Sequence, residues 1–350
     1  MRRLGSILAT VSFAFAVTCT GLAQAGAGRM VVAEDGKCHG TGLLLEPEGL
    51  PSRLIPVVPS GVDGMALPES MDNSAYLPPV ADQGSQGSCV AFAFGYYCKS
   101  YAEAKEHGWS PSEPSHQFSP AYIYNQARVV PSRGMYPTDA VALMQDLGAC
   151  TLVQMPYNDQ DYTSWPSEQA YKEAIHYRVG EGYALSTIAT GSLDAIKSRL
   201  AAGGIGAFGL FVYLSFFDIS RFNNTYCIHD NSGDPLESHL VAVVGYDDAF
   251  ITADGQGAFR CVNSWGTGWG DGGYFWLSYQ ALEDLTFTHG TFFYFDDIAD
   301  DDPDYAARFI MRHPCFRDLG RAVGKGDPSN PTALWPLFDF LSFFDPEAPC

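Results

Sequence analysis

A cysteine, Cys89, ends a turn rich in Gly and Ser and opens an apolar run. The turn spans residues 82–88, and the apolar residues that follow predict a helix over 88–107. A helix N-terminus carries unpaired N–H groups and positive potential, which favour a thiolate over a thiol. Because most cysteines are simply small buried hydrophobic residues, Cys89 alone would be weak support for catalysis.

Two further segments carry groups that would complement a reactive thiol. His239 opens an apolar strand, and its imidazole is the general base best suited to neutral pH. Asn263 ends a second strand and is followed by a turn with two Trp and repeated Gly, residues 265–270. An amide can orient an imidazole without titrating. Taken singly, the histidine could be structural and the turn an ordinary aromatic, Gly-rich one.

Together these segments resemble the papain family of cysteine peptidases, and specifically its secreted bacterial members. Gln83, Cys89, His239 and Asn263 follow the family's order, with the His and the Asn 150 and 174 residues after the Cys. The resemblance covers residues 75–295. It implies an α+β, two-lobed fold in which a helical lobe and a β-barrel-like lobe enclose a cleft, with Cys89 facing His239 across it.

The resemblance also implies a mechanism and a set of site residues. Cys89 would be acylated by a peptide and then released by hydrolysis, with His239 as acid and base and no metal or cofactor. The Gln83 amide and the Cys89 N–H would stabilise the oxyanion, and Asn263 would orient His239. A thiolate–imidazolium pair would require a lowered Cys89 pKa and a raised His239 pKa. The expected substrate-binding residues are Gly134, Met135, Ser238 and Trp265, the last of which would also shield the His–Asn hydrogen bond.

Three positions depart from the family pattern. Gln86 stands where the family usually has a disulfide-bonded Cys, and Val90 replaces the usual aromatic residue after the nucleophile. Met135 replaces a second Gly after Gly134, which puts backbone pairing with the substrate in doubt. Residues 26–73 are too few for the long helical pro-region of lysosomal relatives.

The remaining pattern predicts a helical half followed by a β half. The predicted helices span 88–107, 120–128, 136–147 and 193–202, and the predicted strands span 205–214, 239–246, 258–263 and 274–279.

The two ends of the chain differ from this central domain. Residues 1–25 combine Arg2 and Arg3, an apolar run and Ala23-Gln24-Ala25, the order of a signal peptide, so we expect a secreted or periplasmic protein. Residues 26–74 form a Gly- and Pro-rich lead-in or short pro-segment. Residues 296–350 are an acidic linker and a tail whose aromatic stretch, 334–344, either packs on its own domain or binds a partner.

Composition restricts the partners. The chain has 350 residues and a net charge of −20, from 20 basic and 40 acidic side chains, which excludes a nucleic-acid binder and disfavours anionic membranes. We therefore expect a monomer that acts on proteins or peptides. Eight of the nine cysteines remain after removal of the leader. A free Cys89 leaves an odd seven, so their pairing stays open.

Other functions remain open at this stage. An inactive relative could use the papain-like fold only to bind, and a thiol amidase or transpeptidase could use the same residues to pass the acyl group to an amine. A metal site is disfavoured, because no His and Cys residues show compact ligand spacing.

Overall fold

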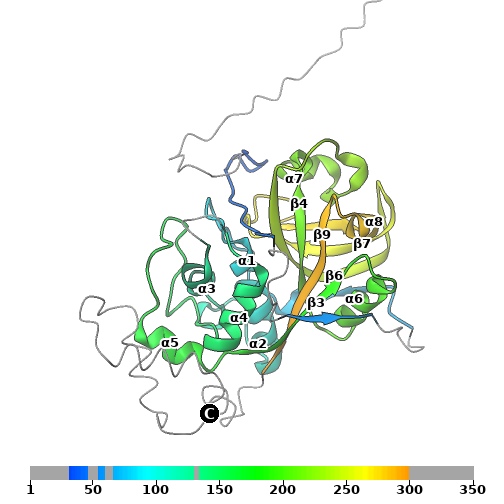
Figure 1. Ribbon diagram of the computed structural model, residues 1–350. Helices are drawn as coiled ribbons and strands as arrows, with labels where there is room; N and C mark the ends of the chain where they lie inside the picture. Colours follow the sequence, from blue (N-terminus) through cyan, green and yellow to red (C-terminus); the bar gives the residue numbers. More distant parts are fainter. Residues whose placement is uncertain (1–30, 46–53, 60–65, 130–133, 299–350) are drawn as a thin grey trace, which may run out of the picture.

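The structure, a computed structural model, describes residues 31–45, 54–59, 66–129 and 134–298. Helices gather on one side of the molecule and a large sheet on the other (Figure 1). The predicted signal peptide and most of the C-terminal tail lie outside the described residues. Among the described residues, no helix has both the length and the apolar character needed to cross a membrane.

The helical lobe is built around the helix that begins at Cys89. It continues without a break through α1 Cys89–Ala91, a π-helical stretch Phe92–Lys99 and α2 Ser100–His107, and ends at Gly108 in the left-handed conformation. Every side chain from Cys89 to Tyr101 except Lys99 and Ser100 is apolar or aromatic, which explains the burial of this helix. The surrounding helices are α3 Pro120–Ala127, α4 Pro137–Leu147 and α5 Glu168–Ala174.

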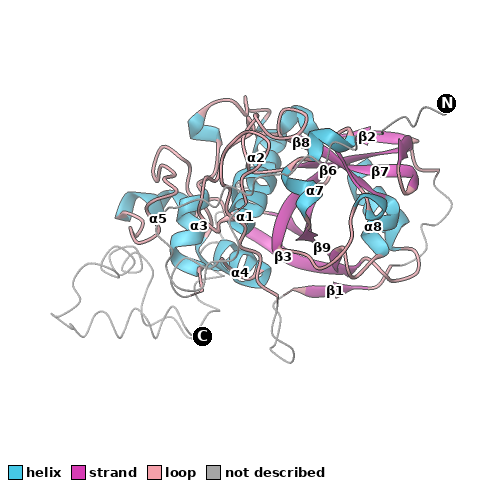
Figure 2. Ribbon diagram, turned by 90° about the horizontal axis from the view of Figure 1, so that it is seen from above, coloured by secondary structure: helices cyan, strands magenta, loops and turns pink. Residues whose placement is uncertain are grey.

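The second lobe is a mostly antiparallel sheet, with nine strands in the part of the chain that the structure describes. Its order is β1-β3-β9-β4-β6-β7-β8-β5, and β2 pairs with β6 beside this path. The strands are β1 Ile55–Val57, β2 Ser70–Asp72, β3 Val179–Ser186, β4 Gly206–Val212, β5 Thr225–Tyr226, β6 Glu237–Thr252, β7 Gly255–Val262, β8 Tyr274–Ser278 and β9 Thr288–Asp297. Helix α6 Ser192–Ala201 lies beside the sheet (Figure 1), and so do α7 Leu214–Phe217 and α8 Tyr279–Glu283 (Figure 2).

The sheet corrects one feature of the predicted fold. A barrel-like lobe requires the first and last strands to pair. Within the described residues, β1 pairs with β3 alone and β5 with β8 alone. The sheet is therefore open. Its two edges are strands of three and two residues, too short to supply the ladder of hydrogen bonds that closure requires.

Strand β6 connects the two hydrophobic cores. Leu240, Ala242 and Val244 point into the core around the Cys89 helix, and Val241 and Val243 point into the core of the sheet lobe. Alternate residues of a strand face opposite sides, so β6 is buried on both faces. This holds His239, near the start of β6, at the junction of the lobes.

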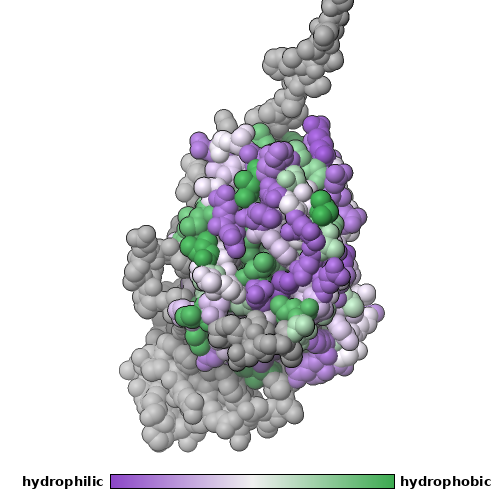
Figure 3. Space-filling view, turned by 90° about the vertical axis from the view of Figure 1, so that its right-hand side faces the viewer, coloured by the Kyte–Doolittle hydropathy of each residue, from purple (hydrophilic) through white to green (hydrophobic). Residues whose placement is uncertain are grey.

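An ion cluster inside the protein ties the end of β9 to the helical lobe. The Lys99 ammonium is fully buried, pairs with Glu103 one turn along the helix and lies 2.5 Å from the Asp297 carboxylate. Asp296 and Asp297 are the last two residues of β9. The sequence predicts a solvated linker that begins at residue 296, but these two residues belong to the sheet. On the face shown in Figure 3, hydrophobic residues are scattered among hydrophilic ones, as on an ordinary solvated surface.

The four predicted helices and the four predicted strands are confirmed. The sequence did not predict β3 or β9, which sit side by side in the sheet, and it gave β6 too short a range. Tyr183 and Tyr294 stack at 4.8 Å in the β3–β9 pair. Such pairs form between segments more than 100 residues apart, a contact that local periodicity does not reveal.

Candidate active site

Cys89 is the first residue of α1, as predicted, and its side chain is fully buried. The turn before it is held by hydrogen bonds to other segments: Ser88 Oγ lies 2.8 Å from the Tyr157 hydroxyl, and the Gln83 N–H donates to the Ser264 carbonyl at 2.8 Å. These contacts fix the start of the helix against the 263–265 turn. The position of the sulfur is therefore set by both lobes.

His239 and Asn263 form the predicted pair. Nε2 of His239 lies 2.7 Å from Oδ1 of Asn263, and both side chains are fully buried. With Oδ1 as acceptor, Nε2 carries the proton, and Nδ1 is left as the basic nitrogen. Among the described residues, Nδ1 has no hydrogen-bond partner.

Aromatic rings shield this hydrogen bond from water. The Trp265 ring centroid lies 5.1 Å from that of His239, and Phe216 packs edge-on to both rings. The Tyr97 hydroxyl donates to the Asn263 carbonyl at 2.8 Å and so ties the Asn to the Cys89 helix. Burial of the His–Asn pair strengthens a hydrogen bond that water would otherwise weaken.

The Gln83 side chain bonds both to its own turn and to the turn that follows Asn263. Its Nε2 donates to the Gln86 carbonyl at 2.8 Å, and its Oε1 accepts from the Ser264 hydroxyl at 2.5 Å. An amide nitrogen carries two N–H donors, and the bond to the Gln86 carbonyl uses one of them.

A segment of the N-terminal lead-in, His39–Leu44, covers this site; we call it the covering segment. The Met135 N–H donates to the Gly42 carbonyl at 3.0 Å, and the Leu44 N–H donates to the Met135 carbonyl at 3.2 Å. These bonds make a parallel bridge between residues 43 and 135. In Figure 1 the segment, in dark blue, descends between the helices and the sheet.

The covering segment also contacts the other three residues predicted to bind substrate. The Ser238 carbonyl accepts from the Gly42 and Leu43 N–H groups, both at 3.3 Å, and Trp265 Nε1 donates to the Gly40 carbonyl at 3.1 Å. A Cβ on Gly134 would lie 1.9 Å from the Gly42 carbonyl oxygen. Only glycine allows the two backbones to approach so closely there.

His39 anchors the upstream end of the segment. Its ring stacks on Trp265 at 5.1 Å, Nε2 lies 2.9 Å from the Asp35 carboxylate and Nδ1 lies 3.3 Å from the Asp82 carboxylate. Hydrogen bonds from His39 and Lys37 hold the pKa of Asp82 well below its usual range against the opposing effect of burial. These contacts hold the His39 ring stacked on Trp265, the ring that shields His239.

The covered site does not hold the predicted ion pair. Burial raises the Cys89 pKa to about 12, although the N–H groups of Leu240, Val90 and Leu43 act in the opposite direction. Burial also lowers the His239 pKa to about 4, against the raising effect of Asn263. The expected shifts were thus wrong in sign for this form of the protein, because without water both groups favour their neutral states.

All eight predicted site residues come together at the junction of the lobes. The Met135 backbone pairs with the covering segment, and its side chain is buried in the core around the Cys89 helix. The sequence missed the role of the covering segment. The sequence feature that could have indicated this segment is the pair of glycines at 40 and 42. A Cβ on residue 40 would lie 2.3 Å from the Gln86 carbonyl oxygen, and a Cβ on residue 42 would lie 2.0 Å from the Gly87 carbonyl oxygen.

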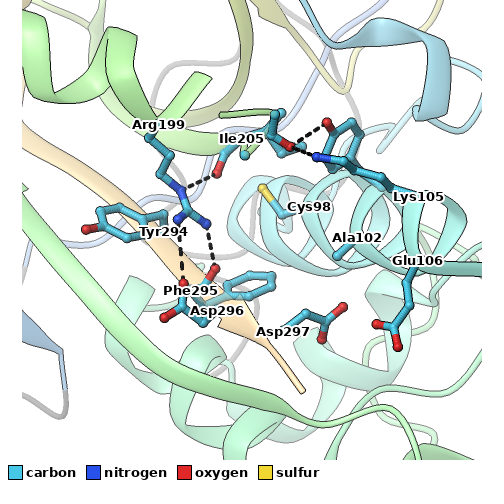
Figure 4. A pocket seen from close by; sticks show the side chains of 13 residues that line it. Cys98, Ala102, Lys105, Glu106, Arg199, Ile205, Tyr294, Phe295, Asp296 and Asp297 are labelled. Carbon is cyan, nitrogen blue, oxygen red and sulfur yellow. Dashed lines mark hydrogen bonds and ion pairs between the residues drawn. The ribbon is translucent and has the colours of Figure 1, made fainter. Parts of the chain in front are cut away.

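A separate cavity of about 370 Å³ lies between α2, the 203–205 turn and the end of β9 (Figure 4). Arg199 crosses it, donating to the Ile205 and Phe295 carbonyls, with Tyr294 against its guanidinium. None of the eight site residues lines this cavity. Arg199 and Lys105 at this cavity donate hydrogen bonds to backbone carbonyls. We therefore regard the Cys89 site, and not this cavity, as the candidate active site.

The fold agrees with comparisons to known proteins. The sequence model of the papain family cysteine proteases matches residues 67–289, and the chain belongs to that family. An uncharacterized peptidase C1-like protein of Acanthamoeba polyphaga mimivirus is 26% identical over 215 residues, which cover 58% of this chain and 65% of the viral protein.

Solved structures show the same architecture. Xylellain, a cysteine protease from Xylella fastidiosa, matches 75% of this chain and 97% of its own at 25% identity and a TM-score of 0.61. The match to a procathepsin B from Trypanosoma congolense covers 74% of this chain and 87% of that protein, at 20% identity and a TM-score of 0.57. This second match shows a similar fold.

Proposed function

We propose that the chain hydrolyses peptide bonds in proteins or peptides, with Cys89 as nucleophile. The observation that carries this proposal is the covering segment. It is a polypeptide bound through backbone hydrogen bonds to Met135 and Ser238, two of the groups expected to bind substrate, beside a Cys and a His–Asn pair. A site that holds one extended chain in this way is suited to hold another.

The residues divide the reaction between them. The Cys89 thiolate attacks the carbonyl carbon, a C–S bond forms, and the oxyanion takes hydrogen bonds from the Cys89 N–H and the second side-chain N–H of Gln83. The C–N bond breaks as Nδ1 of the imidazolium protonates the leaving amine. Neutral His239 then takes a proton from water, the hydroxide attacks the thioester, and the acid and the thiolate are released.

The covering segment is the functional part of a short pro-segment in this proposal. While it is bound, the sulfur is inaccessible, and the thiol and imidazole are neutral. Removing or displacing it admits water, which favours both charged groups and permits the thiolate–imidazolium pair. We place the mature enzyme in the secreted or periplasmic space, as a monomer, after loss of the leader.

Hydrolysis of a peptide library by the full chain tests the proposal, with cleavage products read by mass spectrometry. We expect new amino and carboxyl termini from the wild-type chain and none from Cys89→Ala. Transfer of the acyl group to an added amine in preference to water would identify a transpeptidase. Absence of both products from a folded wild-type chain, with or without its N-terminal segment, would indicate a binding protein.

A further inference from the structure

The chain just before the covering segment forms a short hairpin on the sheet lobe; we call residues 32–38 the upstream hairpin. Its two ends are joined by an antiparallel bridge between residues 32 and 38. The Glu34 N–H donates to the Phe217 carbonyl at 2.8 Å. The Glu34 carboxylate accepts from the Ser220 N–H at 2.9 Å and from the Gly270 N–H at 2.6 Å. One carboxylate thus takes two backbone donors from two separate turns.

The Gly270 donor is positioned by contacts within the sheet lobe. Trp269 Nε1 donates to the Phe216 carbonyl at 2.9 Å, which ties the turn before Gly270 to α7. Gly270 has a φ of 62°, and a Cβ there would lie 2.7 Å from the Tyr274 carbonyl oxygen, so this turn requires glycine. Because the upstream hairpin supplies none of these contacts, the donor stays in place when the hairpin leaves.

The Ser220 donor lies in the short 3-10 helix η4 Ile219–Phe222, which is also part of the sheet lobe. The acids next to the two donors do not oppose an anion strongly. Asp218 is paired with Arg221, and Asp271 is exposed to water, which screens its charge. The pair of N–H groups therefore suits a carboxylate.

The mechanism determines which half of a substrate would meet this pair of donors. Nδ1 of His239 protonates the leaving amine, and the His239 ring lies 5.1 Å from Trp265 and 6.0 Å from Phe216. These two rings belong to the turns that lead to Gly270 and Ser220. The residues after the cleaved bond therefore extend toward the two donors, and this half of a peptide ends in a carboxylate.

We propose that the Ser220 and Gly270 N–H groups form a carboxylate-binding site for the part of a substrate that follows the cleaved bond. The inference rests on the proposed peptidase function. Glu34 occupies the site in the covered form. The substrate carboxylate is either the C-terminus of a short leaving peptide or an acidic side chain of a longer one. A charged acceptor bonds two N–H groups more strongly than a neutral amide does, so the site selects for charge.

The first test measures kcat/KM of the full chain for pairs of peptides that differ in one carboxylate. In one series, peptides with different numbers of residues after the cleaved bond end in a free carboxylate or in an amide. In the other, long amidated peptides carry Glu or Gln at each of those positions. Competition from the covering segment lowers every value by the same factor, so ratios within pairs report the site alone.

We expect one length or one position at which the charged peptide exceeds its neutral partner by about tenfold. A preference in the first series identifies the C-terminus as the ligand and makes the enzyme a remover of short C-terminal peptides. A preference in the second series identifies an acidic side chain. Equal kcat/KM within every pair would overturn the proposal.

Two variants of Ser220 test the donor itself. Ser220→Pro removes the N–H at a position in the first turn of a helix, where proline is tolerated, and Ser220→Ala keeps it. We expect the ratio within the selective pair to fall toward one in Ser220→Pro and to be unchanged in Ser220→Ala. Equal ratios in the two variants would contradict the assignment. The wild-type pairs decide the question alone if Ser220→Pro does not fold.

The second test does not depend on turnover. Iodoacetamide labelling of Cys89 is followed in full-length Glu34→Ala, in Glu34→Gln and in the matched control Glu113→Ala, which changes an exposed acid of the helical lobe. We expect labelling about tenfold faster than wild type in Glu34→Ala, an intermediate rate in Glu34→Gln and the wild-type rate in Glu113→Ala. Equal labelling of Glu34→Ala and Glu113→Ala would show that the two donors do not hold a carboxylate.

The outcomes separate this proposal from the peptidase function. Hydrolysis with equal rates within every pair leaves the peptidase function intact and refutes the carboxylate site. Absence of hydrolysis of every peptide, with fast labelling of Glu34→Ala, refutes the peptidase function and shows that the two donors serve only to anchor the upstream hairpin.

Discussion

Nε2 of His239 and Oδ1 of Asn263 lie 2.7 Å apart in a setting from which water is excluded by Trp265 and Phe216. This contact fixes the tautomer that leaves Nδ1 as the basic nitrogen. It is already complete in the covered form, so the base is oriented before the site opens. What the covered form lacks is the charge on the Cys and the His.

Replacing Cys89 by Ala should abolish hydrolysis and leave the fold intact. A methyl group cannot attack a carbonyl, and loss of a nucleophile costs on the order of a thousandfold or more in kcat. Peptide hydrolysis is the measurement, with circular dichroism to verify folding. Substantial turnover by a clean Cys89→Ala preparation would refute the assigned nucleophile.

Replacing Gln83 by Ala should lower kcat by roughly ten- to a thousandfold and change KM less, because an oxyanion donor acts mainly in the transition state. The matched control is Gln86→Ala, which removes a neighbouring amide of the same turn that bonds to Asp159 and Tyr157. Both constants are measured on one peptide. If the two variants lose kcat equally, Gln83 acts only by holding the turn.

Replacing Gly42 by Val should open the site. A Cβ on residue 42 would lie 2.0 Å from the Gly87 carbonyl oxygen, so the covering segment could not remain seated. Cys89 would then be wetted, and its pKa would fall from about 12 toward the range of an activated thiol.

Iodoacetamide labelling near pH 6 measures this opening. We expect Gly42→Val to react much faster than the wild-type chain, and the additional change His239→Ala to slow the reaction again by removing the imidazolium. Labelling of Gly42→Val that becomes appreciable only above about pH 8 would argue against an ion pair in the open site.

The buried histidines predict how stability depends on pH. The pKa values of His239 and His289 both fall to about 4 in the folded protein, from about 6.5 in an unfolded chain. Between pH 6.5 and 4 the unfolded chain binds more protons, so acid favours unfolding, by up to about 1.4 kcal/mol per pH unit for each histidine. Carboxylates with lowered pKa values in the folded protein, such as Asp82, destabilise it in acid only at lower pH, where they become protonated.

Urea unfolding of the Cys89→Ala chain at pH 7, 6 and 5 measures this slope without complications from the thiol. Adding His239→Gln should make the decline in unfolding free energy visibly shallower, since one of the two groups no longer titrates. An unchanged slope would mean that His239 is not held neutral in the folded protein.

Several features of this protein follow from the sequence alone. The turn before Cys89, the apolar strand after His239 and the Trp- and Gly-rich turn after Asn263 each have a local pattern, because helix starts and strand ends depend on neighbouring residues. The order of the four catalytic candidates then indicates the family and, with it, the two-lobed fold. The substrate-binding roles of Gly134, Met135, Ser238 and Trp265 stay predictions from the family resemblance, and the structure brings all four residues against the covering segment.

The tertiary structure alone decided three matters: the open sheet, the pairing of β3 with β9 and the state of the site. Gly42 and Met135 are far apart in the sequence, and their pairing needs a close backbone approach that no periodicity encodes. The pKa shifts of Cys89 and His239 depend on that approach. A helix start and a neighbouring imidazole predict a charged pair, but burial under the covering segment removes the water that would stabilise the charges, and it reverses both shifts.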